Sequence, residues 1–189
     1  MVAIRDASKG SLAPLYLILK HDAMRLMGKQ LLLLVSDGVD QAEVEQLRQA
    51  FEGEDALVLV SCPHDAVVVE TVYNGRRGKD ITIDVPLEIA REVAFDGLVI
   101  PDGLLASLSL RKDGRVLDLV AYFHQRRLPI FASGNAVEIL YESHVLFQQV
   151  VVREGSPLSS FVERAVGVLL DKPSAPYGSQ FAYRPTMEA

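Results

Sequence analysis

The chain has 189 residues, 49% of them hydrophobic, and a formal net charge of −6. This length and composition suit one folded domain, and the acidic balance argues against nucleic-acid binding, which needs a basic face. The single cysteine, Cys62, excludes an intramolecular disulfide. The sequence has no apolar run of about 18 residues and no signal-peptide pattern, so we expect a cytoplasmic protein that does not bind membranes.

The two ends of the chain differ from its centre. Residues 11–27 predict a helix whose apolar side chains share one face, suited to packing on the domain or on a second copy. The final residues, 172–189, contain three prolines and three aromatic residues without any period, which predicts an arm. We therefore expect an N-terminal helical extension (1–28), an α/β domain (29–171) and a C-terminal tail (172–189).

Short apolar runs alternate with amphipathic stretches across the central region. The predicted strands are Gln30–Ser36, Ala56–Ser61, Leu98–Ile100, Leu128–Ala132 and Leu146–Val152. The predicted helices are Asp40–Phe51, Pro86–Val93, Leu108–Gln125 and Pro157–Leu170, the first with Asp40 as its N-cap. Continuous apolar strands are typical of parallel sheets covered on both faces, which predicts an α/β fold. Within residues 67–84, Asn74-Gly75 predicts an antiparallel flap hairpin.

The stretch from Leu128 to Leu140 predicts the most informative local geometry, a buried strand that turns sharply into a helix. Such turns hold nucleophiles and anions, because the first N–H groups of the helix have no intrahelical partner. Ligands of parallel sheets bind beyond the carboxyl ends of the strands. Those ends here are Asp37-Gly38, Pro101-Asp102-Gly103 and Ser133-Gly134-Asn135.

Three segments, in this order, resemble the ThiJ/PfpI family of the class I glutamine amidotransferase-like superfamily. They are 33–40 (LLVSDGVD), 95–103 (FDGLVIPDG) and 110–130, and the resemblance extends over roughly residues 29–170. It implies a flavodoxin-like three-layer sandwich with a mostly parallel central sheet. It also implies self-association, which is common in that family.

The residues that carry the family's chemistry are replaced in this chain. The family's nucleophilic cysteine matches Gly134, and the following histidine matches Asn135. Its acidic partner matches Asp40, one methylene shorter. Asp102 stands for the first glycine of the family's Pro-Gly-Gly turn, where a carboxylate would repel the anion that develops during the reaction. The expected residual pocket comprises Asp40, Asp102, Gly103, Ser133, Gly134 and Asn135, with no catalytic residue, cofactor or metal.

Three functions remain open at this point. The leading hypothesis is a non-catalytic, self-associating binding or structural module; by resemblance, large catalases carry a related inactive domain. The second is a hydrolase, deglycase or peptidase with a relocated nucleophile at Ser133 or Cys62, which requires a base within hydrogen-bond reach. No histidine lies near Ser133 in the sequence. The third is a sensor of an unidentified small ligand that uses Asp40, Asp102 and the helix N-terminus at Asn135.

Overall fold

Five parallel strands form the central sheet of the computed structural model, which describes residues 24–145 and 150–171. The strands are β1 (Gln30–Leu34), β3 (Leu57–Ser61), β8 (Gly97–Ile100), β9 (Ile130–Ser133) and β10 (Val150–Arg153). Their order is β3-β1-β8-β9-β10, and every neighbouring pair is parallel. The chain connections run in one direction from β1 to β3 and in the other from β8 to β10, and in such sheets ligands commonly bind near this switch point, beyond the carboxyl ends of the strands.

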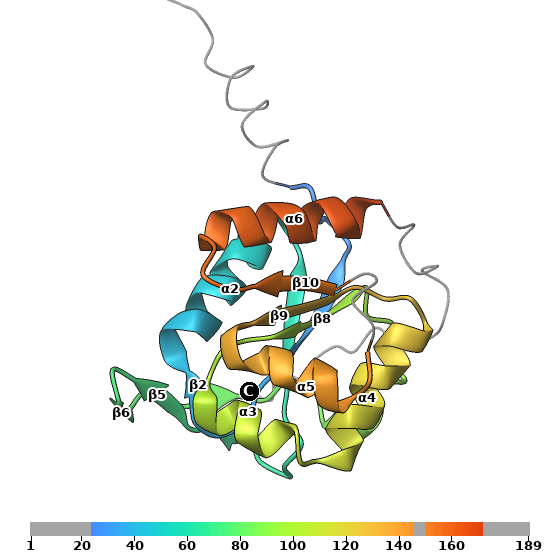
Figure 1. Ribbon diagram of the computed structural model, residues 1–189. Coiled ribbons are helices and arrows are strands. Elements are labelled where there is room, and N and C mark those ends of the chain that lie inside the picture. Colours follow the sequence, from blue (N-terminus) through green and yellow to red (C-terminus); the bar gives the residue numbers. More distant parts are fainter. Residues whose placement is uncertain (1–23, 146–149, 172–189) are drawn as a thin grey trace, which may run out of the picture.

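Helices cover both faces of this sheet and complete a three-layer sandwich (Figure 1). One face carries α2 (Gln41–Gly53) and α6 (Leu158–Leu170), and the other carries α4 (Gly114–Gln125) and α5 (Val137–Glu142). A shorter helix, α3 (Leu104–Leu110), follows β8 at the carboxyl edge and packs beside the short strand β2 (Val39–Asp40) and the turn after β9. The arrangement confirms the flavodoxin-like α/β fold.

The continuous apolar strands separate the core into two halves. Leu31 and Leu33 of β1 point toward α2 and α6, whereas Leu32 and Leu34 point toward α4 and the turn η1 (Leu87–Ile89). All four leucines are buried, as expected for a strand covered on both faces.

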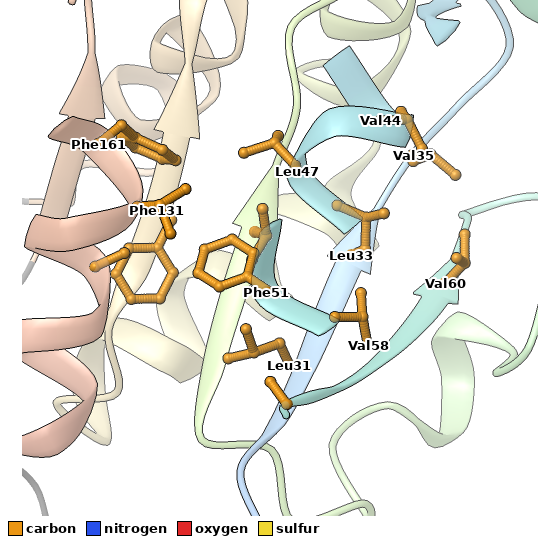
Figure 2. Close-up of a cluster of buried hydrophobic side chains, with 14 of the residues drawn as sticks. Leu31, Leu33, Val35, Val44, Leu47, Phe51, Val58, Val60, Phe131 and Phe161 are labelled. Atoms are coloured by element: carbon orange, nitrogen blue, oxygen red, sulfur yellow. The ribbon is translucent and has the colours of Figure 1, made fainter. Parts of the chain in front are cut away.

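Three phenylalanines join the sheet to the helices of the first face (Figure 2). The ring of Phe131 on β9 lies 6.0 Å from that of Phe51 on α2 and 6.5 Å from that of Phe161 on α6. All three side chains are buried. Burying each contributes roughly 1.5–3 kcal/mol, so this cluster holds α2 and α6 against β9.

The flap predicted around Asn74-Gly75 is present and consists of short strands. The strands β5 (Thr71–Tyr73) and β6 (Arg76–Arg77) pair antiparallel, and Asn74 and Gly75 adopt φ angles of 49° and 73°. β2 (Val39–Asp40) pairs in parallel with β5, and β4 (Val68–Val69) pairs antiparallel with β7 (Ile81–Thr82). The flap therefore follows β3 in the chain and is attached, through β5, to the short strand β2 after β1.

Some helix boundaries differ from the prediction. The region 86–93 contains only the 3₁₀ turn η1, and the helix predicted over 108–125 is two helices, α3 and α4. The break occurs at Asp113, whose carboxylate accepts a hydrogen bond from the Arg115 N–H at 2.9 Å and starts a new helix. By contrast, Asp40 caps α2 as predicted, accepting from the Glu43 N–H at 3.0 Å.

Several predictions concern residues that the structure does not describe. Residues 11–23 of the first predicted helix, residues 146–149 before β10 and the tail 172–189 lie outside the described ranges. Residues 25–28 form a turn rather than the end of a helix. Among the described helices, none combines the length and apolar character needed to cross a membrane.

Candidate functional site

The sharp turn after β9 has the predicted geometry, and glycine occupies its bend. Ser133 is the last residue of β9, and Gly134 begins the 3₁₀ turn η2 (Gly134–Ala136), which leads directly into α5. Gly134 adopts φ +53°, a left-handed conformation that costs other residues about 1–2 kcal/mol. Gly134 therefore has the backbone of a nucleophile elbow without a side chain.

The carboxylate of Asp102 fills the anion-binding position of this turn. Its Oδ1 accepts hydrogen bonds from Gly103 N at 2.7 Å, Asn135 N at 2.9 Å and Asn135 Nδ2 at 2.9 Å. The Gly103 and Asn135 N–H groups lie where α3 and η2 begin, so neither has a partner within its own helix. Both donate to Asp102 Oδ1 instead. The sequence predicted that Asp102 would repel an incoming anion. In the structure, Asp102 also accepts the hydrogen bonds of the Gly103 and Asn135 N–H groups, which an anion at this turn would need.

Asp102 also occupies the space above Gly134. A Cβ built on Gly134 would lie 2.5 Å from Asp102 Oδ1 and closer still to its Cγ and Oδ2. Real Cβ atoms do not make contacts this short, so a side chain at position 134 and the observed position of Asp102 exclude one another. The glycine and the aspartate therefore form one structural unit.

The second polar group of the site joins three elements through Glu43. Glu43 Oε1 accepts a hydrogen bond from Ser133 Oγ at 2.6 Å, and Arg153 Nη1 donates to Oε1 at 2.7 Å and to Oε2 at 2.5 Å. Ser133 is only 2% exposed, and the exposed fractions of the Glu43 and Arg153 side chains are 11% and 23%. Arg153 Nε donates to the carbonyl of Ser156, which holds the guanidinium against the loop after β10.

These two groups face a common polar hollow of about 240 Å³ at the carboxyl end of the sheet. Its lining consists of Glu43, Asp102, Ser133, Gly134, Arg153, Gly155 and Ser156. β8, β9 and β10 all end at this hollow, which accords with the rule that parallel sheets bind ligands beyond their carboxyl ends.

Comparison with known proteins identifies the fold family. The model of the DJ-1/PfpI family matches residues 29–152. This chain belongs to the DJ-1/PfpI family. Among solved structures, it resembles DJ-1beta of Drosophila melanogaster (TM-score 0.64, 18% identity, 77% of this chain and 92% of that one). It also resembles oxidized DJ-1 of Toxoplasma gondii (TM-score 0.61, 14% identity, 76% and 88%). At these identities, the structures show a shared fold.

Relatives by sequence include proteins much longer than this match. Catalase HPII of Pseudomonas putida is 30% identical over 89 residues, which are 47% of this chain and 12% of the catalase. An uncharacterised protein of Staphylococcus saprophyticus is 27% identical over 121 residues, 62% of this chain and 66% of that protein. This chain therefore matches only a small part of the catalase and about two thirds of the staphylococcal protein.

The structure brings together most of the residues predicted for this site. Asp102, Ser133 and Gly134 line the hollow, and Gly103 and Asn135 donate to Asp102. Asp40, in contrast, is exposed, caps α2 and does not line the hollow. The acidic side chain that faces the turn from this segment is Glu43, three residues further along.

Cys62, the other candidate nucleophile, lies outside the hollow, directly after β3. Its side chain is 1% exposed, and its Sγ donates to the carbonyl of His64 at 3.2 Å. Burial raises the pKa of the Cys62 thiol, which favours the protonated form over the nucleophilic thiolate. The ring of His64 contacts Ser36 Oγ at 3.4 Å. In residues 24–145 and 150–171, no three His, Cys, Asp or Glu side chains are arranged to hold a metal.

Four residues of the hollow were not predicted from the sequence: Glu43, Arg153, Gly155 and Ser156. The signal for Arg153 was available, because it directly follows the predicted strand Leu146–Val152, and the carboxyl ends of parallel strands meet at one edge. Glu43 lies three residues after the predicted N-cap Asp40, and nothing in that spacing shows which carboxylate turns toward β9. Gly155 and Ser156 directly precede Pro157, in a composition that ordinarily separates a strand from a helix.

Proposed function

We propose that this chain is a non-catalytic member of the DJ-1/PfpI family that acts as a binding or structural module. The observation that carries this proposal is the position of Asp102. Its carboxylate accepts hydrogen bonds from the backbone N–H groups of Gly103 and Asn135, and it occupies the space above Gly134. Acyl-transfer and related reactions need such donors free, because the negative charge of the intermediate develops there. With Asp102 in place, these two N–H groups are not available to an oxyanion at this turn.

The contact between Ser133 and Glu43 supports a second candidate, an enzyme with a relocated nucleophile. At 2.6 Å, Ser133 does have a potential base within hydrogen-bond reach, contrary to the expectation from the histidine positions. However, the same carboxylate binds Arg153 through both of its oxygens. If Glu43 took the Ser133 proton, this partly buried ion pair would lose its negative partner. The arrangement therefore favours a structural hydroxyl over a nucleophile.

Turnover assays separate the two candidates. We expect the purified chain to hydrolyse p-nitrophenyl acetate, casein-derived peptides and methylglyoxal-modified amino acids no faster than its Ser133→Ala and Cys62→Ala variants. The variants serve as matched controls, because each removes one candidate nucleophile. Turnover that Ser133→Ala or Glu43→Gln abolishes, in a variant with unchanged circular dichroism, would establish the enzyme instead.

The module is also proposed to associate with itself and to reside in the cytoplasm, without nucleic-acid or membrane partners. Self-association accords with the resemblance to the family and with the apolar stripe of residues 11–27. Sedimentation velocity at micromolar concentration tests it: we expect a dimer or larger species, and a monomer at all concentrations would contradict self-association. That result would leave the assignment of a non-catalytic site unaffected.

A further inference from the structure

We propose that the hollow beside Gly134 binds a small zwitterion, a molecule carrying both an ammonium and a carboxylate group. The inference deepens the proposed function, because it names the ligand class of a site that binds without turnover. It depends on which hydrogen-bonding groups of the hollow are already used and which are still available.

Asp102 presents one unused carboxylate oxygen to the hollow. All three hydrogen bonds to this carboxylate end on Oδ1. Oδ2 has no hydrogen-bond partner within the described residues, and it lies directly above Gly134, where a Cβ would collide with it. A charged oxygen with free lone pairs at the base of a polar hollow is a suitable acceptor for an ammonium group.

Arg153, which lines the same hollow, has unused donors. Its Nε donates to Ser156 O and its Nη1 to Glu43, whereas Nη2 has no partner in residues 24–145 and 150–171. The contacts with Glu43 and Ser156 hold the guanidinium plane in position. The two N–H groups on Nη2 are therefore oriented before a ligand arrives, and guanidinium N–H groups are well suited to binding carboxylates.

The charges of the lining favour a ligand that carries both signs. Glu43 and Arg153 pair with one another, so Asp102 is the remaining uncompensated charge among the lining side chains. A simple anion would meet the Asp102 and Glu43 carboxylates, and a simple cation would leave the Arg153 Nη2 donors unused. A zwitterion satisfies the free acceptor and the free donors together. In addition, Ser156 Oγ beside the hollow is buried and has no partner among the described residues.

The test is a set of NMR titrations of the ¹⁵N-labelled full chain with glycine, β-alanine and 4-aminobutyrate. These probes carry the two charged groups at increasing separation, and acetate and methylamine carry one each. We expect at least one zwitterion to shift the amide signals of Gly134, Asn135 and Gly155 and to bind at least tenfold more tightly than either single-charge probe.

Two variants examine the assigned contacts. Asp102→Asn keeps an oxygen for the N–H donors but places an NH₂ group where Oδ2 was, and Arg153→Lys keeps the charge but removes the Nη2 donors. Each is expected to weaken zwitterion binding at least tenfold. Asp118→Asn, a matched change at an exposed site on α4, should leave binding unchanged.

The outcomes separate this inference from the proposed function. If all three zwitterions bind no more tightly than acetate and methylamine, or if Asp102→Asn and Asp118→Asn bind equally well, the ligand assignment is wrong and the non-catalytic role is unaffected. If a zwitterion binds as expected and NMR then shows it being converted to product, the ligand class stands and the non-catalytic role is wrong.

Discussion

Replacing Gly134 by alanine provides a quantitative test of the link between Gly134 and Asp102. The new Cβ would occupy the position of the Asp102 carboxyl group, so Asp102 must move and release hydrogen bonds from Gly103 N and Asn135 N. Alanine is also strained at a left-handed φ of +53°. These are separate costs, and a second substitution can separate them.

The backbone cost is about 1–2 kcal/mol, and losing one charge-assisted hydrogen bond costs about 1.5–3 kcal/mol. If one such bond is lost on balance, Gly134→Ala should lower the free energy of unfolding by roughly 2.5–5 kcal/mol. In an Asp102→Ala background, the three carboxyl atoms that the Cβ would meet are absent. There, Gly134→Ala should cost only the backbone part, which gives a coupling free energy of about 1.5–3 kcal/mol between the two positions.

Urea unfolding of the four proteins of this cycle, followed by circular dichroism, measures the coupling. Gly28→Ala is a suitable control, because Gly28 has φ +82° and a Cβ at that position would have nothing within 4 Å. It should cost about 1–2 kcal/mol and show no coupling to Asp102→Ala. Additive effects of Gly134→Ala and Asp102→Ala, to within about 0.5 kcal/mol, would refute the reasoning that Asp102 fills the space above Gly134.

Two further predictions concern titratable groups away from this contact. Cys62 is buried, and burial raises the pKa of its thiol. The thiol should therefore react slowly with 5,5′-dithiobis(2-nitrobenzoic acid) at pH 8 in the native protein and fully in urea. Rapid labelling of the native protein would contradict the buried position. The hydrogen bond from Arg115 lowers the pKa of Asp113 below its ordinary value of 3.8, so the charged carboxylate stabilises the fold above that pH. Asp113→Asn should have a lower free energy of unfolding than the parent protein at neutral pH. This difference in stability should shrink as the pH falls through the lowered folded-state pKa of Asp113. If urea unfolding shows the same difference at low pH as at neutral pH, the prediction is wrong.

The fold followed from the sequence because its signals are local. The apolar runs around Leu31–Leu34 and Val58–Val60 are continuous, so they predicted buried parallel strands before any tertiary contact was known. The Asn74-Gly75 pair predicted the flap turn for the same reason. The helix over 108–125 was less accurate, because an N-cap at Asp113 interrupts a pattern that is otherwise periodic.

The site was predicted only in part, because its contacts join residues that are far apart in the chain. Glu43 and Arg153 are 110 residues apart, and no local pattern pairs them. The charge of Asp102 was evident from its residue type, but the direction of its side chain was not. The sequence therefore predicted that Asp102 repels an anion, and it did not predict the hydrogen bonds from the Gly103 and Asn135 N–H groups to Asp102. Similarly, Asp40 and Glu43 form one capping pattern, and only the packing of α2 against the sheet shows that Glu43 faces Ser133.

The central claim is that Asp102 holds the N–H groups that a reacting anion would need, and the amide signals of these groups test it most directly. An amide N–H that is hydrogen-bonded to a side chain exchanges its hydrogen with solvent more slowly than a free one. In the ¹⁵N-labelled chain, the amides of Gly103 and Asn135 should therefore exchange slowly, and Asp102→Ala should speed the exchange of both at least tenfold, whereas Asp118→Ala should not. Amides that exchange equally fast in the parent chain and in Asp102→Ala would show that these donors are free of Asp102 and open to a substrate.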